Sequence, residues 1–362
     1  MRTVCKENMC AGCTACLEVC CKNAITVEDG IVHFNAVIDE SKCINCGACE
    51  KVCPNNTPVK LEKPIGWFHG WADDSIRPGS SSGGAASAII KSFLSSGGKV
   101  CSCVFENGRF GFKILSDVAD ALIFAGSKYV KSDPSGVFAQ IKELLRKGEK
   151  VLFLGLPCQV AGLKNFVRDH ENLYTVDLIC HGSPSPKLLD RYLKECGVSI
   201  NSVHDIKFRN KSRFGLSVDG KRLMPTRVAD SYTRAFLASV DYTENCYFCQ
   251  FATEARCADI TLGDAWGCDA DEMQKGVSLI LCQSEKGTEL LDNAGLHIEA
   301  ADSEKAKAHN HQLVHPSEKH SGREKFFKVI LKGGSFRRAT RRAMPKDSIK
   351  QNIKYVLSRI KK

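Results

Sequence analysis

The sequence predicts two domains of different fold class: a small α+β module rich in cysteine, and then a larger α/β domain. Ten of the 20 cysteines lie before residue 54, most of them in two similar runs separated by a hairpin signal. From Ser80 onward, short apolar runs alternate with helical patterns, which is typical of βαβ units around a mostly parallel sheet. The expected boundaries are residues 1–62 for the module, 63–79 for a linker, 80–334 for the α/β domain and 335–362 for a basic tail.

The elements follow from the period of the apolar residues. In the module, Asp29-Gly30 lies between two short apolar stretches and predicts a hairpin turn. In the larger domain, buried or half-buried runs predict strands at residues 100–105, 121–124, 151–154, 174–179, 203–208, 258–262 and 277–282. Helical spacing predicts helices at residues 85–94, 137–147, 158–167 and 186–196, with mostly helical structure from residue 286.

Composition excludes several classes of protein. Of the 362 residues, 43% are hydrophobic and 25% charged, close to globular averages, so wholesale disorder is excluded. Most of the net charge of +10 lies in residues 336–362, so a generally basic nucleic-acid binder is not indicated. No apolar run is long enough to span a membrane and no secretory signal is visible, so a cytoplasmic location is expected. In reducing cytosol, clustered thiols indicate metal binding more often than disulfides.

The two cysteine runs repeat with a period of 33 residues and have the spacing of iron–sulfur ligands. Three cysteines at i, i+3 and i+6 surround one [4Fe-4S] cube, and the fourth, at i+10, crosses to the other cube. Zinc or a thiol-rich surface is the alternative, but tetrahedral zinc sites favour two CxxC pairs. Cys21 follows Cys20 where bacterial ferredoxins carry proline, which leaves two adjacent candidates for one ligand, although Cys20 keeps the spacing. Cys5 is interpreted as a spare thiol. The expected ligands are Cys10, Cys13, Cys16 and Cys53 for one cluster, and Cys20, Cys43, Cys46 and Cys49 for the other.

A further series of motifs extends over residues 77–283. These are SSSGG (80–84), GSKYVKS (126–132), GLPCQ (155–159), DLICHGSPSP (177–186), KFRNK (207–211), CYFC (246–249) and ADITLGDAWG (258–267). In kind and order they resemble the coenzyme F420 hydrogenase/dehydrogenase β-subunit family, in which an N-terminal double ferredoxin is a common fusion. The resemblance implies a flavin-binding α/β domain in an oxidoreductase that passes electrons between ferredoxin-type clusters and a hydride-handling substrate. F420 reductases and 7-hydroxymethyl chlorophyll a reductase are relatives.

The resemblance implies FAD as the cofactor. A flavin suits this role because it converts between one-electron and two-electron chemistry. No G-x-G-x-x-G fingerprint follows a strand, so the pocket is expected to be of a non-Rossmann type. A serine–glycine stretch ahead of a helix can offer hydroxyl and backbone N–H groups to a pyrophosphate. The alternatives are a flexible linker at residues 80–84 and an ordinary loop at residues 127–129. The expected flavin-binding residues are Ser80, Ser81, Ser82, Gly83, Gly84, Ser127, Lys128 and Tyr129.

Four central cysteines predict a third [4Fe-4S] cluster. Cys158 and Cys180 follow two buried strands, and the crevice beyond strand carboxyl ends is where ligands bind in open α/β sheets. Together with the Cys246 and Cys249 pair they supply four thiolates. One alternative is that the two strand-end cysteines are small buried core residues and bind no metal. A second alternative is that Cys257 is the fourth ligand.

His181 and Asp264 are the catalytic candidates. A titrating imidazole suits proton delivery to a flavin or substrate, and Asp264 follows a strand end. The alternatives are a loop histidine and a turn carboxylate. Nearby, the basic residues of KFRNK suit an anionic substrate or cofactor tail, or else a solvated face.

The expected partners are a redox protein, such as a ferredoxin or a hydrogenase or dehydrogenase subunit, and a small-molecule hydride donor or acceptor. No nucleic acid is expected, and membrane contact is at most peripheral, through an apolar stripe on the basic tail. The tail is otherwise interpreted as solvated or disordered. Beside a catalytic oxidoreductase stand two other hypotheses: a non-catalytic electron-transfer subunit, and a cluster-based sensor on nucleic acid.

Overall fold

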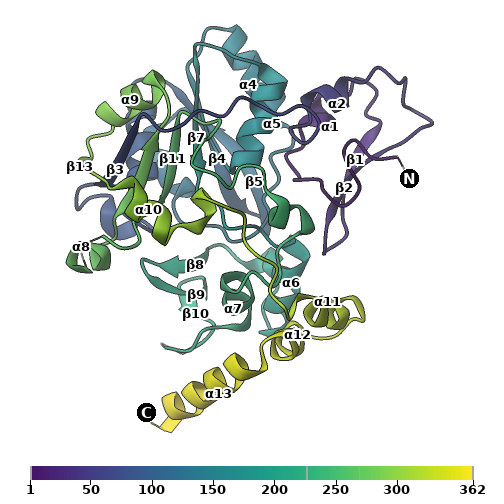
Figure 1. Cartoon of the computed structure of the whole chain (residues 1–362), viewed down its shortest axis with the longest axis vertical. Coiled ribbons are helices and arrows are strands. Elements are labelled where there is room, and N and C mark those ends of the chain that lie inside the picture. The colour runs from purple at the N-terminus through teal and green to yellow at the C-terminus, as the bar shows by residue number, and fades with distance from the viewer. Residues whose placement is uncertain (1, 226, 269, 361–362) are drawn as a thin grey trace.

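A computed structural model describes residues 2–225, 227–268 and 270–360. The small module contains the hairpin β1 (Ile25–Asp29) and β2 (Phe34–Ile38) and two short helices, α1 (Ala15–Val19) and α2 (Ala48–Val52). The strands pair antiparallel, with Asp29 opposite Phe34, so the predicted hairpin is confirmed. In Figure 1 the module lies at one side of the molecule, with α1 and α2 beside α5.

The larger domain is built on one eight-stranded mixed sheet, in the order β13-β3-β12-β11-β7-β6-β4-β5. Four central strands run parallel: β4 (Lys99–Glu106), β6 (Val151–Leu154), β7 (Leu173–Leu178) and β11 (Ile260–Asp264). The strands that flank them pair antiparallel: β5 (Arg109–Leu115), β12 (Ser278–Cys282), β3 (Gly66–Trp71) and β13 (His297–Ala300). The expected α/β class is therefore confirmed, and β6, β7 and β11 end at the same edge of the sheet.

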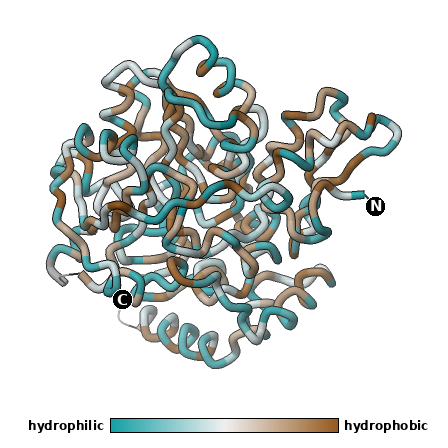
Figure 2. Tube along the Cα trace, turned by 45° about the horizontal axis from the view of Figure 1, so that its top comes forward, coloured by the Kyte–Doolittle hydropathy of each residue, from teal (hydrophilic) through white to brown (hydrophobic). Residues whose placement is uncertain are grey.

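Alternate residues of the central strands bury opposite faces of the sheet. Val151 and Phe153 pack with α4 (Val137–Arg146) and α5 (Pro157–Val167), whereas Leu152 and Leu154 pack with α3 (Ala85–Ser95). Helix α9 (Glu285–Asp292) joins α3 on its face, and the small module covers α4 and α5 from outside. The resulting three-layer arrangement is visible in Figure 1, and Figure 2 shows hydrophobic stretches of the chain running through its interior.

A second, smaller layer lies below the main sheet. It contains a three-stranded sheet of β8 (Ile206–Asn210), β9 (Arg213–Val218) and β10 (Lys221–Arg222). Its aromatic core joins these strands to α6 (Pro186–Glu195), α7 (Ser231–Leu237), α11 (Arg323–Leu331) and α12 (Phe336–Ala343). The remaining helices are α8 (Ala270–Lys275), α10 (Ser303–His309) and α13 (Pro345–Ile360), with 3-10 turns η1 (Arg77–Gly79), η2 (Val118–Phe124), η3 (Ile200–Ser202), η4 (Glu244–Phe248) and η5 (His311–Leu313). No helix of the described ranges is both long and apolar enough to cross a membrane.

Three sequence expectations need correction. The segment expected as a linker, residues 63–79, contributes β3 to the interior of the main sheet, between β13 and β12. The strand expected at residues 121–124 is part of the 3-10 turn η2, whose Leu122 and Ile123 are exposed and cannot fill a strand position in the core. The basic tail is not solvated throughout, because α12 packs its apolar face against α7, α6 and α11.

Helix α12 should therefore stabilise the fold. The Phe336 side chain is fully buried and contacts the rings of Tyr192 and Phe326. Truncating a buried phenylalanine typically costs about 3–5 kcal/mol, so Phe336→Ala should lower the free energy of unfolding by that amount. The matched control is Leu331→Ala, since Leu331 is 61% exposed and a surface change is usually within about 0.5 kcal/mol. Urea unfolding of both variants measures the difference; equal stabilities would contradict the packed role of α12.

Candidate functional site

The two cysteine runs adopt the same backbone path. Gly12 and Asn45, which are equivalent in the repeat, both have a positive φ, as do the equivalent Thr14 and Gly47. At the same position of each loop, an N–H donates to a cysteine sulfur: Gly12 N to Cys10 Sγ and Asn45 N to Cys43 Sγ, both at 3.4 Å. Such N–H groups directed at sulfur are the environment in which iron–sulfur clusters are held and tuned.

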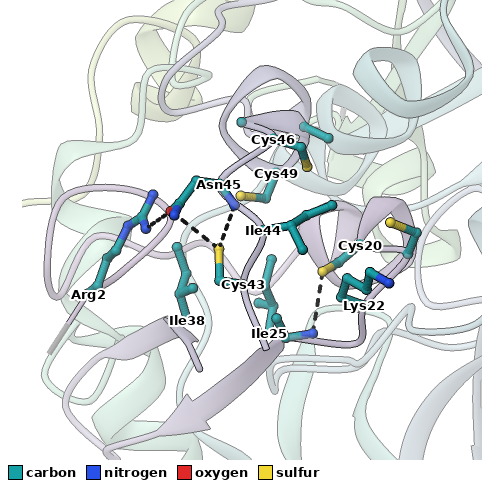
Figure 3. Close-up of a pocket in the computed structure, with 14 residues that line it drawn as sticks. Arg2, Cys20, Lys22, Ile25, Ile38, Cys43, Ile44, Asn45, Cys46 and Cys49 are labelled. Carbon is teal, nitrogen blue, oxygen red and sulfur yellow. Dashed lines mark hydrogen bonds between the residues drawn. The ribbon is translucent and has the colours of Figure 1, made fainter. Parts of the chain in front are cut away.

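The eight cysteines of the repeat gather at two separate cavities. We call the set Cys10, Cys13, Cys16 and Cys53 the inner site, because each side chain is less than one-tenth exposed. The outer site, shown in Figure 3, consists of Cys20, Cys43, Cys46 and Cys49, which are half-buried apart from the exposed Cys46. In each site the fourth cysteine comes from the other run of the repeat.

Two further cysteines lie at these cavities. Cys21 lines the outer site beside Cys20, but the Ala24 N–H donates to Cys20 Sγ (3.4 Å), which orients that thiol. Cys5 is buried and lines the inner site, where the Asn55 side chain donates to its sulfur at 3.7 Å. The spacing of the repeat carries no signal for Cys5, because it is brought there by the pairing of Thr3 with Val37.

The donor sets fit iron–sulfur clusters and not a single metal ion. Within the described residues, no three His, Cys, Asp or Glu side chains are close enough to hold one ion together. A cube binds each cysteine at a different corner, so its thiolates are spread more widely than around one ion. Burial raises the pKa of the Cys13 thiol to about 11, so a thiolate there needs a positive partner such as iron.

The module is held against the α/β domain by specific contacts. The Glu18 carboxylate of α1 accepts from the N–H groups of Gly136 (2.9 Å) and Ala139 (2.7 Å) at the start of α4. Gly162 of α5 lies so near Cys13 that a Cβ there would come within 2.9 Å of the Cys13 sulfur. The inner site therefore lies against the larger domain, whereas all residues that line the outer site belong to the module.

A third cavity lies where the strands of the main sheet end. Cys158 begins α5 after β6, and Cys180 follows β7, so the parallel order of these strands brings both thiols to one edge. Cys246 and Cys249, at the turn η4, close the cavity from the other side. We call these four cysteines the third site. Its cavity is also lined by Met9, Ala11 and Asn55 of the inner-site loops.

Cys257, the competing candidate, is directed elsewhere. It is buried, and its sulfur faces the Pro157 carbonyl oxygen at 3.8 Å. Burial raises its pKa to about 12. Its surroundings are those of a small core residue.

Three of the residues expected around a flavin, Ser81, Ser127 and Tyr129, meet in one network centred on Arg209. The Arg209 guanidinium forms an ion pair with Asp264 (2.6 Å) and donates to the Ser81 carbonyl (2.7 Å). It also donates to the Tyr129 hydroxyl (3.3 Å), and the Ser127 N–H donates to Ser81 Oγ (2.9 Å). The network therefore connects the 80–84 loop, the 127–129 loop and the end of β11, which the sequence could only treat as separate motifs.

The 80–84 loop is packed against the sheet. A Cβ at Gly83 would lie 2.5 Å from the Gly70 carbonyl oxygen, so only glycine allows the loop this close to β3 and β12. The Ser80 and Ser82 hydroxyls donate to the carbonyls of Ile76 and Val277. Helix α3 then begins at Ala85, and its N-cap residue Gly84 provides no side-chain cap, so the first N–H groups of the helix are available to an anion.

The remaining candidates differ in their surroundings. Lys128 donates to the carbonyls of Phe124 (2.8 Å) and Ala125 (3.1 Å), which directs its ammonium away from the Arg209 network.

His181 lines the third-site cavity, with Nδ1 2.8 Å from the Gln312 side-chain nitrogen. Although His181 reaches the surface, surrounding atoms desolvate the ring and, with the nearby His311, lower its pKa to about 4. Its role as a proton donor, like that of Asp264, stays a prediction.

Two protein-family models match parts of this chain. Residues 148–306 match the model that describes the C-terminal part of the coenzyme F420 hydrogenase/dehydrogenase β subunit. Over these residues the chain is similar to the F420 hydrogenase/dehydrogenase β-subunit family. Residues 36–59, which include the second cysteine run, match the 4Fe-4S binding domain. Together the two matches support an iron–sulfur electron-transfer role of oxidoreductase type, with a ferredoxin-type domain ahead of the region that resembles the β subunit.

The other comparisons add less. No curated protein matches the chain. Among solved structures, it is similar to a chain in the xenon-derivatised F420-reducing [NiFe] hydrogenase complex from Methanosarcina barkeri, with 18% identity and a TM-score of 0.46. The match covers 76% of this chain and 96% of that one. The region matched by the β-subunit model, residues 148–306, contains Asp264 of the Arg209 network and all four cysteines of the third site.

Proposed function

We propose that the chain is an iron–sulfur flavoprotein oxidoreductase that passes electrons between [4Fe-4S] clusters and a small-molecule hydride donor or acceptor, F420 or another, through FAD. The observation that carries the proposal is the third site: four thiols around one cavity that shares its wall with the inner site. Clusters at the outer, inner and third sites would form a one-electron path from the exposed Cys46 to the sheet edge.

The Arg209 network is the proposed flavin site. A flavin bound there would supply the conversion between single electrons and a hydride. In this chain, the uncapped start of α3 offers N–H groups to a pyrophosphate, and Arg209 adds a positive charge beside them. His181 contacts the third-site cavity and feels the charges of Asp264 and Arg209, so it stands between the two sites.

The outer site is the proposed entry for a redox partner protein, such as a ferredoxin or a hydrogenase or dehydrogenase subunit. Of the twelve proposed ligands, Cys46 alone is exposed, and Arg2 and Lys22 line the same cavity. A cationic rim of this kind suits an acidic partner, because electrostatic steering raises the rate of encounter.

The proposal is tested by anaerobic purification followed by measurement of iron, acid-labile sulfide and extracted flavin. We expect about twelve iron and one FAD per chain, counting three four-iron cubes. Mixing the oxidised protein with reduced F420, and separately with reduced nicotinamide, should bleach the flavin absorption with at least one of them. Stoichiometric flavin that no hydride donor bleaches would favour a non-catalytic electron-transfer subunit, and about eight iron without flavin would reject the proposal.

A further inference from the structure

Lys131 connects the inner site with the third site. Its backbone N–H donates to the Pro184 carbonyl (2.9 Å), in the loop that follows Cys180. Its side-chain ammonium donates to the Ala11 carbonyl (3.2 Å), inside the loop between Cys10 and Cys13. One residue therefore bonds to both cysteine-bearing loops.

The position of the lysine is built closely around its side chain. Lys131 is only 5% exposed, and it lines the cavity of the third site. A Cβ at Gly12 would lie 3.2 Å from the Lys131 side chain, so the absence of a side chain at Gly12 makes room for the lysine. The ammonium also lies 5.2 Å from the centre of the Phe34 ring.

In the part of the chain that the structure describes, the charge of Lys131 is not paired with a carboxylate. Among the residues that the structure describes, its polar contacts are to backbone atoms, and none of the ion pairs found includes it. Burying a cation without a paired anion is costly, and buried charges are normally paired or placed beside metal groups. The missing negative charge has to come from the groups that occupy the neighbouring cavities.

Clusters at the two sites would supply that charge. The sulfurs of Cys13, Cys158, Cys180 and Cys249 all feel the positive charge of Lys131. Four thiolates outweigh the positive charge of an iron–sulfur core, so an occupied site is anionic and becomes more so when it is reduced. A cation between two such sites favours the reduced form of both.

We propose that Lys131 is the shared counter-ion of the inner and third clusters and that it raises the reduction potential of both. The inference deepens the proposed function and rests on it for the third cluster. It assigns Lys131 as a positioning residue of the electron path, because the lysine acts through charge on clusters that other residues bind. The outer cluster should be unaffected, since Lys131 does not line that cavity.

The test is a redox titration of the anaerobically loaded full chain, followed by electron paramagnetic resonance. In Lys131→Met, the inner and third signals should appear at lower potential than in the wild type, with the outer signal unchanged. Lys131→Arg, which keeps the charge, should restore most of the shift. The matched control is Lys142→Met, the same charge change at an exposed position of α4, which should leave all three signals in place.

The outcomes separate this inference from the function on which it rests. Wild-type protein with about eight iron per chain would remove the third cluster, and the shared role with it. About twelve iron with unchanged potentials in Lys131→Met would overturn the role of Lys131 and leave the proposed function standing. Lys131→Met could also fail to retain the inner and third clusters. In that case, full iron content in Lys131→Arg supports the role of Lys131 as a counter-ion. Iron loss in both variants contradicts it.

Discussion

Replacing Cys246 by serine should lower the iron content by about four per chain, because a four-iron cube that loses a thiolate from a four-thiol site is poorly retained. Cys246 is oriented toward the third site, with Thr243 Oγ1 3.5 Å and Ser183 Oγ 3.9 Å from its sulfur. Neither hydroxyl can replace the thiolate as a soft ligand for iron. Iron and sulfide analysis of the anaerobically purified variant measures the effect.

Cys257→Ser is the matched control for that experiment. The two cysteines are 11 positions apart, and the sequence allows either as a ligand, but Cys257 does not line the third-site cavity and its sulfur faces the Pro157 carbonyl. We expect the control to keep the full iron content. Loss of iron from Cys257→Ser with none from Cys246→Ser would mean that the ligand set is wrongly assigned.

The second large effect is expected at Arg209. Changing Arg209 to methionine leaves the Asp264 carboxylate without its ion-pair partner and removes the bonds to Ser81 and Tyr129. Breaking a buried pair by removing one member typically costs about 3–5 kcal/mol. The Arg209 side chain is 6% exposed and that of Asp264 is 19% exposed, so the pair is part-buried and the cost should fall toward the lower end of that range. We expect the variant to unfold at lower urea concentration and to lose flavin on gel filtration.

Lys207→Met separates that effect from a general loss of positive charge. Lys207 lies on the same strand, β8, but its side chain is 66% exposed and pairs only with Asp205 at the surface. Surface ion pairs contribute about 0–1 kcal/mol, so stability and flavin content should stay near the wild type. Equal flavin retention in both variants would contradict a flavin site at the Arg209 network.

A third arm distinguishes stability from cofactor binding in Arg209→Met. The double variant Arg209→Met/Asp264→Leu removes the unpaired carboxylate, and replacing both partners of a buried pair by apolar groups is often close to neutral for stability. It should recover much of the stability without recovering the flavin. Recovery of flavin together with stability would show that Arg209 acts only through the fold.

The sequence predicted the cysteine module in detail because its information is local. Spacings of three residues place sulfurs on one loop, and the repeat of 33 residues makes Gly12 and Asn45 adopt the same positive φ. The helix at Ala85 and the buried strand at Val151 were likewise found from their period, within one residue at either end. By contrast, the strand expected at residues 121–124 was wrong, since a short apolar run does not distinguish a strand from a turn of helix.

What the sequence alone determined, then, is where the soft thiol side chains lie along the chain and how their spacing repeats, since each spacing involves neighbours a few positions apart. Tertiary structure decided the rest: β3 in the sheet interior, Cys5 at the inner site, Cys257 outside the third, and Lys131 between two cavities. Each of these depends on segments that lie tens to hundreds of residues apart. Their contacts form only when burial of apolar faces brings the sheet, the helices and the module together, and no local spacing records that outcome.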